Sequence, residues 1–466
     1  MPLRTVGSML TFPLVLLGAC FADGAKTSIY KLWDSPLLEN KYVMSAENVW
    51  KAYPAASVVV SADGCGNFTS VQDAVDYVSS MDTKMHTVID ILPGTYREKV
   101  LIPKSKVSIM LRGSNPLETI ISYDDYAARE LSNGYVLGTL WSCSVCVEAN
   151  NFVAVNITFQ NSAPPPPPFS NETAEGPMAV ALRISGTMAA FYSCRFIGWQ
   201  DTLYDHKGLH YFRDCYIEGN VDFVFGDATS TYEGCVFYAK ARKHGGAVTA
   251  QYRRSTAKRS GFVFLRSIIT GNGRVYLGRA WGNASRAVYA WSFINNIVQK
   301  GGWYDWGDAS RHATTFFAMF DCWGPGTNTS GWVPWSHVLN TSQAQPFISY
   351  SFIDACQWLG PLPQGAGSLT RQLGYRVNFT QVPPAPTYPY TCFSRTPPSS
   401  PALVFQPPSA APAASPASAP LSPPTPGPGR VLPPPSLSSL LRGYPPPPQQ
   451  PQQQAPPSLA APAPAV

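Results

Sequence analysis

Cys194-Arg-Phe-Ile-Gly198 is followed 21 residues later by Cys215-Tyr-Ile-Glu-Gly219, and 20 residues after that by Cys235-Val-Phe-Tyr-Ala239. Each stretch begins with a small residue, has an apolar residue two positions on, and ends in a turn residue two positions later. This is the two-residue alternation of a short β-strand. Ile157-Thr-Phe-Gln-Asn161 and Ser267-Ile-Ile-Thr-Gly271 share the pattern.

The intervals between these strands indicate a solenoid. From start to start they are 37, 21, 20 and 32 residues, and coils of ~20 residues that carry a strand at the same place are typical of repeat architectures. Stacked coils place equivalent side chains in ladders, so we expect Cys194, Cys215 and Cys235 to be stacked, buried thiols. The longer intervals should hold loops. The pattern therefore predicts an all-β body of parallel coils.

A short amphipathic helix is predicted near the start of this body, over residues 70–78. Val71, Ala74, Val75 and Val78 fall on one face, and Thr69 or Ser70 can cap the first turn. A helix placed there would cover the open end of the solenoid.

Residues 1–24 have the composition of a secretory signal peptide. Arg4 supplies a positive charge, Met9 to Leu17 form an apolar run, and small residues follow up to Gly24. This run and every later stretch fall short of the ~20 apolar residues that a membrane span needs. Leu17-Gly-Ala-Cys20 also fits a bacterial lipoprotein cleavage site, an alternative that the plant-like composition of the tail disfavours.

The remaining chain divides into a body, residues 25–381, and a tail, residues 382–466. The tail holds 28 of the 46 prolines, and its three charged residues are all arginine. Such a composition cannot bury enough apolar surface to fold, so we expect an extended or polyproline II segment. It would act either as a flexible linker or as a wall anchor like the proline-rich segments of extensins.

Seven N-glycosylation sequons and ten cysteines are compatible with export. Cys20 should leave with the signal peptide, and the spacing of the other nine does not define a disulfide framework. Cys143-Ser-Val-Cys146 lacks a partner pair at zinc spacing, so we assign no metal. Asn156 is expected on a packed strand and hence to be a poor acceptor. The sequons are at Asn67, Asn156, Asn171, Asn283, Asn328, Asn340 and Asn378.

Two aspartates, Asp201 and Asp222, lie 21 residues apart, which is one coil of the repeat. On adjacent coils of a β-helix their carboxyls would be ~5 Å apart. Two carboxylates that close cannot easily both ionise, so one should act as an acid while the other stays charged. The alternative is that each aspartate only caps a turn.

Several motifs, in this order and spacing, resemble those of the plant pectin methylesterases (pectinesterases), over about Val58 to Leu359. The resemblance implies a right-handed parallel β-helix and an aspartyl esterase that needs no metal or cofactor. The motifs are Asp63-Gly-Cys-Gly-Asn-Phe-Thr-Ser-Val-Gln-Asp-Ala74, Pro93-Gly-Thr-Tyr-Arg-Glu98, Gly138-Thr-Leu-Trp-Ser142, Gln200-Asp-Thr-Leu203, Val221-Asp-Phe-Val-Phe-Gly226, Leu277-Gly-Arg-Ala-Trp281, Gly302-Trp303 and Ser351-Phe-Ile-Asp354.

The resemblance also implies roles for individual residues. Asp222 matches the nucleophile, Asp201 the general acid, and Arg279 the arginine that pairs with the nucleophile. Gln200 matches a donor of the oxyanion hole. The residues that match substrate-binding positions are Thr139, Tyr204, Phe225, Trp281 and Trp303.

One departure from the family pattern concerns the oxyanion hole. Met178 stands before Ala179-Val-Ala-Leu-Arg183, where the family usually has a glutamine. A thioether cannot donate a hydrogen bond, and loss of one oxyanion donor typically lowers kcat ~10²–10³-fold. A catalytically impaired, pectin-binding pseudoenzyme is therefore an alternative. The N-terminus is also too short for the inhibitor-like pro-region of many plant members.

Charge placement favours a polyanionic partner. Residues 234–304 contain twelve basic and no acidic residues, and such a block attracts polyanions. De-esterified pectin fits better than nucleic acid because a signal peptide is present; a solvated basic loop is the alternative. We expect a secreted, monomeric cell-wall enzyme that acts on pectin, with a proteinaceous pectinesterase inhibitor as a second partner. The sequence is also compatible with a structural wall glycoprotein that acts through its tail, and with a β-helical lyase or galacturonase.

Overall fold

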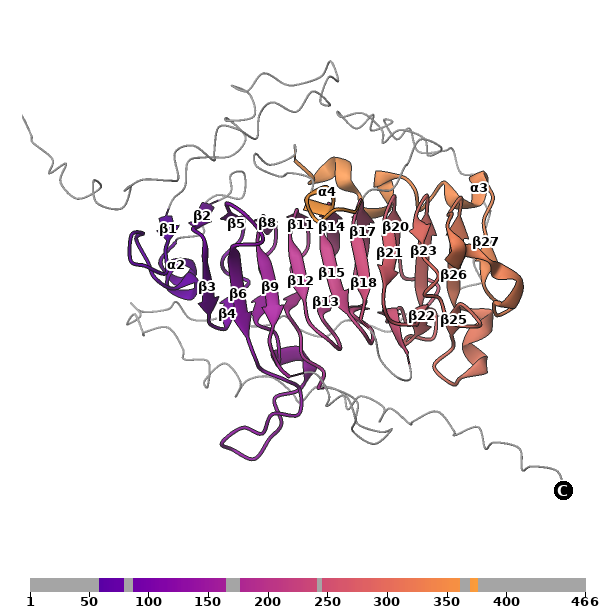
Figure 1. The fold of residues 1–466 in the computed structure, drawn as a ribbon, viewed down its shortest axis with the longest axis horizontal. Helices are drawn as coiled ribbons and strands as arrows, with labels where there is room; N and C mark the ends of the chain where they lie inside the picture. Colours follow the sequence, from indigo (N-terminus) through magenta and orange to yellow (C-terminus); the bar gives the residue numbers. More distant parts are fainter. Residues whose placement is uncertain (1–57, 79–86, 165–176, 241–244, 361–368, 376–466) are drawn as a thin grey trace, which may run out of the picture. The chain divides into compact units, whose positions relative to one another are not determined.

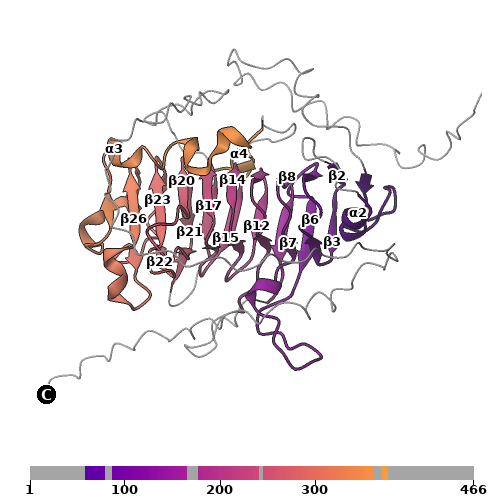
Figure 2. The ribbon, with the colours of Figure 1, turned by 180° about the vertical axis from the view of Figure 1, so that it is seen from behind.

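The computed structural model describes residues 58–78, 87–164, 177–240, 245–360 and 369–375. The chain winds repeatedly through three sheets, and a typical coil contributes one strand to each of them (Figure 1). Strands of successive coils pair in parallel. The fold is a right-handed parallel β-helix, which confirms the predicted solenoid. Figure 2 shows the same succession of coils from behind.

The first sheet has eleven strands, which lie side by side in chain order. They are β1 (Val58–Val60), β2 (Thr87–Ile91), β5 (Ile109–Gly113), β8 (Val153–Val155), β11 (Ala189–Tyr192), β14 (Leu209–Arg213), β17 (Thr229–Glu233), β20 (Gly261–Leu265), β23 (Arg286–Ala290), β26 (Phe316–Phe320) and β27 (His337–Val338).

The other two sheets have eight strands each. The β4–β25 sheet comprises β4 (Val100–Ile102), β7 (Val145–Val147), β10 (Leu182–Ile184), β13 (Leu203–Asp205), β16 (Val224–Gly226), β19 (Gly246–Gln251), β22 (Val275–Ala280) and β25 (Trp303–Tyr304). The β3–β24 sheet comprises β3 (Gly94–Arg97), β6 (Thr119–Tyr123), β9 (Thr158–Asn161), β12 (Arg195–Ile197), β15 (Tyr216–Gly219), β18 (Val236–Ala239), β21 (Ile268–Gly271) and β24 (Phe293–Ile294).

The five stretches that predicted the solenoid are five consecutive neighbours in one sheet, from β9 to β21. The thiols of Cys194, Cys215 and Cys235 are unpaired and fully buried, as predicted. Burial raises the pKa of the Cys194 and Cys215 thiols well above the usual range. These thiols therefore behave as small apolar groups.

Short helices lie at the ends and edges of the coils. The predicted helix is α2 (Val71–Tyr77), which Ser70 caps and which buries Val71, Ala74 and Val75 beside β1. The others are η2 (Thr139–Trp141), η3 (Ala309–Ala313), η4 (Pro325–Thr327), η5 (Thr329–Gly331), α3 (Thr341–Ala344), η6 (Tyr350–Ile353), η7 (Ala355–Gln357) and α4 (Leu369–Gln372).

Some expectations fall outside the described residues or need correction. The signal peptide, nearly all of the proline-rich tail, Asn171 and Asn378 lie outside them. Asn156 is buried as expected, but it occupies the turn between β8 and β9 with a φ of 55°, so its placement on a strand was wrong. Among the helices of the described ranges, none is long and apolar enough to span a membrane.

Candidate active site

One row of side chains on the outer face of the β4–β25 sheet contains several residues that the sequence singled out. We call this row the site ladder, because its members occupy equivalent positions on successive strands. The alternate positions, such as Leu203 and Val224, are buried in the core, so the ladder faces away from it. It consists of Leu101, Cys146, Arg183, Tyr204, Phe225, Ala250, Arg279 and Tyr304.

Asp201 and Asp222 lie in the turns that lead into β13 and β16. Gln200 pairs with Val221 across the two coils, and the Asp201 N–H donates to the Val221 carbonyl at 3.0 Å. The aspartates therefore occupy the same position on adjacent coils, one strand spacing of ~4.8 Å apart. Their φ angles of 61° and 50° are ones that aspartate tolerates better than most residues. Both side chains are almost fully buried.

Arg279 reaches Asp222 from β22, two strands beyond β16. Its Nε donates to Oδ1 at 2.8 Å, and its Nη2 donates to Oδ2. The guanidinium also lies over the ring of Trp306, 4.2 Å from the ring centroid. This fork fixes the carboxylate and favours its charged form. Sequence reasoning missed Trp306, whose only signal is its place three residues after the Gly302-Trp303 motif.

Gln200 precedes Asp201 and pairs with Met178 on the preceding coil. The Gln200 side chain is 1 % exposed, and neither amide atom has a hydrogen-bond partner among the described residues. Met178 is half-buried, and its sulfur accepts a hydrogen bond from the Thr139 hydroxyl at 3.7 Å. Thr139, Met178 and Gln200 therefore line up on one side of the two aspartates.

Aromatic rings continue the site ladder beyond the aspartates. Tyr204 and Phe225 stack with ring centroids 4.2 Å apart, and Trp281 lies 6.1 Å from Phe225. Tyr252, which was not predicted, packs against Trp281 with ring centroids 4.1 Å apart. Burial raises the pKa of Tyr204 to about 12, so its hydroxyl stays protonated at neutral pH. Such rings are suited to stacking against sugars.

Comparison with known proteins matches this architecture. The pectinesterase family model matches residues 57–356. This chain belongs to the pectinesterase family. Pectinesterase 31 of Arabidopsis thaliana is 42% identical over 313 residues, which cover 65% of this chain and 94% of that protein. Pectinesterase QRT1 of the same plant is 42% identical over 304 residues, covering 65% and 78%. The structure of pectin methylesterase from carrot superposes with a TM-score of 0.59 at 32% identity, covering 70% of this chain and 98% of that one.

One aromatic residue of the family pattern is not on the site ladder. Trp303 is 1 % exposed and stacks on Phe317 in the core, with ring centroids 4.6 Å apart. It pairs in register with Gly278, whereas Tyr304 pairs with Arg279. Because Arg279 faces outward, Tyr304 shares its face and Trp303 faces the interior. The structure thus places Tyr304, rather than Trp303, beside the aspartates.

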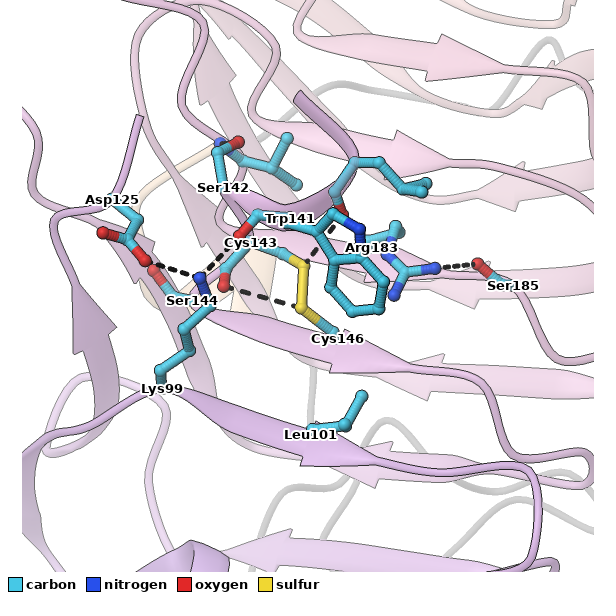
Figure 3. The surroundings of a disulfide bond; sticks show 12 residues. Lys99, Leu101, Asp125, Trp141, Ser142, Cys143, Ser144, Cys146, Arg183 and Ser185 are labelled. Atoms are coloured by element: carbon cyan, nitrogen blue, oxygen red, sulfur yellow. Dashed lines mark hydrogen bonds and ion pairs between the residues drawn. A yellow bond between two sulfur atoms is a disulfide. The ribbon is translucent and has the colours of Figure 1, made fainter. Parts of the chain in front are cut away.

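A disulfide between Cys143 and Cys146 lies at the next part of the ladder (Figure 3). Cys146 precedes Arg183 in the ladder, and the Arg183 guanidinium lies 5.1 Å from the centroid of the Trp141 ring. The spacing of the cysteines along the chain defines no disulfide framework, so this bond was not predicted. The disulfide joins the end of η2, which carries Thr139 and Trp141, to β7.

Charged groups around this segment are internally paired. Lys99 donates to Asp125 at 2.5 Å, and burial lowers the pKa of its amine (Figure 3). Arg183 pairs with Glu148 at 3.1 Å. His206 contacts Ser185 at 2.9 Å, and burial lowers its pKa to about 3, so the imidazole is neutral at physiological pH. In the described ranges no three His, Cys, Asp or Glu side chains are grouped as a metal site would need.

The basic block after the aspartates is largely compensated. Acids from earlier or later segments pair with five of its members, so their charge is not free to form a polyanion-binding patch. The pairs are Lys240–Glu218, Lys258–Asp227, Arg259–Asp354, Arg266–Glu233 and Arg279–Asp222. Arg253 is buried and donates to backbone carbonyls.

Proposed function

We propose that this member of the family hydrolyses methyl esters of galacturonate units in pectin, giving methanol and free carboxylates. The observation that carries the proposal is the position of Asp222. Arg279 holds its carboxylate with two hydrogen bonds, and Asp201 occupies the same place on the adjacent coil. One coil thus supplies an oriented nucleophile, and its neighbour supplies an acid.

The first step is acylation of Asp222. Its carboxylate adds to the ester carbonyl carbon, and the carbonyl electron pair moves onto oxygen. When that pair returns, the bond to methoxide breaks, and Asp201 donates its proton to release methanol. The product is an anhydride between Asp222 and the galacturonate carbonyl.

The second step is hydrolysis of this anhydride. Asp201, now a carboxylate, accepts a proton from water, and the hydroxide attacks the galacturonate carbonyl carbon. The bond to Asp222 breaks, and the nucleophile returns to its carboxylate form beside Arg279. Gln200 is placed to donate to the oxyanion in both steps, since its amide N–H groups have no partner among the described residues.

We infer the setting of this activity from the sequence. Residues 1–24 would direct secretion, residues 25–381 would form the catalytic domain, and residues 382–466 would form an extended tail in the cell wall. The exposed side chains of Asn283 and Asn328 are accessible sequons. The enzyme would act as a monomer, and a proteinaceous inhibitor that covers the site ladder would regulate it.

Methanol release from highly methylated pectin tests the proposal. We expect Asp222→Asn and Asp201→Asn each to lower kcat by about 10⁴-fold or more. Asp308→Asn, which changes an exposed aspartate in the loop before η3, is the matched control and should leave kcat unchanged. Wild-type release no greater than that of Asp222→Asn would overturn the proposal and favour the pseudoenzyme. Products that absorb in the ultraviolet would indicate a lyase instead.

A further inference from the structure

Met178 removes a hydrogen-bond donor from a position beside the catalytic aspartates. Its sulfur is the third side-chain atom, where a glutamine would have its amide carbon. The sulfur accepts the hydroxyl of Thr139 at 3.7 Å. Met178 is also in register with Gln200. A hydroxyl therefore lies where the amide of a glutamine would otherwise be found.

We propose that the Thr139 hydroxyl is the second oxyanion donor in this chain and replaces the amide that Met178 lacks. The inference rests on the proposed esterase function and assigns one more catalytic residue to it. In the resting enzyme the hydroxyl donates to the thioether. In the transition state it turns to the oxyanion that forms between Thr139 and Gln200.

The energetics favour this exchange. A thioether sulfur is a weak acceptor, so little is lost when the hydroxyl leaves it. An oxyanion is a charged acceptor, and hydrogen bonds to charged groups are roughly twice as strong as neutral ones. The donor thus gains strength only when negative charge develops, which is the condition for a contribution to kcat rather than to substrate binding.

The Thr139 hydroxyl is also held in place before substrate binds. Ala127 connects both partners, because its N–H donates to the Met178 carbonyl and its carbonyl accepts from the Gly138 N–H, each at 2.8 Å. Ser142 donates to the Thr139 carbonyl at 3.0 Å, and the disulfide follows directly. The Thr139 side chain is 7% exposed and β-branched, which restricts its rotamers.

A double-mutant cycle tests the proposal with methylated pectin as the substrate. Thr139→Val keeps the shape and removes the hydroxyl; we expect kcat to fall about 10²-fold with little change in KM. Met178→Gln supplies an amide donor. In that background, Thr139→Val should cost at least tenfold less. Thr139→Ser retains the hydroxyl and should restore most of the activity.

Two controls separate this effect from damage to the fold. Thr249→Val removes a different buried hydroxyl of the β4–β25 sheet, one that donates to the Leu277 carbonyl, and it should not change kcat. Thermal unfolding of each variant shows whether Thr139→Val costs more stability than Thr249→Val.

Each remaining outcome counts against the proposal. A loss in KM alone would make Thr139 a binding residue only, and an equal loss in both backgrounds would show that it does not replace the missing amide. Activity that appears only with Met178→Gln would overturn this proposal and leave the role of Asp222 intact. Absence of activity above the Asp222→Asn level in every variant would overturn the proposed function itself.

Discussion

The contact between Arg279 and Asp222 depends on the shape of the guanidinium as well as on its charge. Two N–H groups meet two oxygens, and the plane of the group lies over Trp306. Lysine keeps the charge but has no planar fork. We expect Arg279→Lys to lower kcat by about 10- to 10²-fold, since one charge-assisted hydrogen bond contributes about 1.5–3 kcal/mol. Methanol release measures the effect.

A matched substitution keeps this prediction specific. Arg274 binds only the carbonyl of Val298 in the described part of the chain, so Arg274→Lys should leave kcat unchanged. Equal activity of Arg279→Lys and wild type would mean that a point charge suffices beside Asp222, and the bidentate contact would then have no catalytic role.

At the same scale, the sequence predicts some positions and not others. The interval of one coil correctly indicated that Asp201 and Asp222 would be neighbours, because parallel coils preserve register. It could not indicate which side Trp303 faces. Gly301 and Gly302, both with positive φ, precede that residue, and such a turn resets the alternation of inward and outward side chains.

At the scale of single elements, helix α2 shows how distant residues complete a local signal. Ser70 accepts from the Asp73 N–H at 3.2 Å, as a capping residue should. Glu98, from the turn after β3, adds an acceptor for the N–H groups of Val71 and Gln72 at 2.7 and 2.9 Å. A carboxylate there also interacts favourably with the positive end of the helix dipole.

We predict that Glu98→Gln lowers the free energy of unfolding by about 1–3 kcal/mol, because charged acceptors contribute the most to such bonds. Ser70→Ala should cost about 1 kcal/mol. Denaturant unfolding measures both, and Glu118→Gln, at an exposed site, is the control. A cost for Glu98→Gln no larger than that of the control would show that the carboxylate does not anchor the helix.

The same elements show the limit of sequence reasoning. The 3.6-residue pattern and the serine cap are local, so both could be read directly. Glu98 lies 27 residues from Val71, and only the path of the chain brings it there. The Cys143–Cys146 bond was missed for a different reason: the spacing permits a disulfide, but only the fold brings the two thiols together at the start of β7.

At the scale of the whole body, the interior is organised as ladders that run from coil to coil. Four consecutive ring contacts of 4.7, 4.5, 5.1 and 4.3 Å connect β11, β14, β17, β20 and β23. The rings are those of Phe191, Phe212, Tyr232, Phe264 and Tyr289. The repeat in the sequence predicted ladders of this kind for the cysteines. It did not predict this one, because loops of different length separate the aromatic residues.

Phe212 lies inside this stack, between Asp201 and Asp222 along the chain. It is fully buried and stacks on Phe191 and Tyr232 at once. In a solenoid each coil is stabilised mainly by its two neighbours, so Phe212→Ala should weaken both interfaces of the central coil. We expect a loss of about 3–5 kcal/mol in the free energy of unfolding. Catalytic activity should disappear in the same transition, because the two aspartates lie on either side of the weakened strand.

Phe68→Ala provides the comparison, because this half-buried ring lies at the N-terminal end of the described coils and stacks only on Tyr77, at 5.2 Å, in that region. Its loss should be clearly smaller and should leave activity intact until the main transition. Parallel measurement of circular dichroism and methanol release during thermal unfolding distinguishes the two variants. If Phe212→Ala were no more destabilising than Phe68→Ala, the aromatic ladder would not be what couples the central coils, and their cohesion would have to come from the backbone hydrogen bonds between strands.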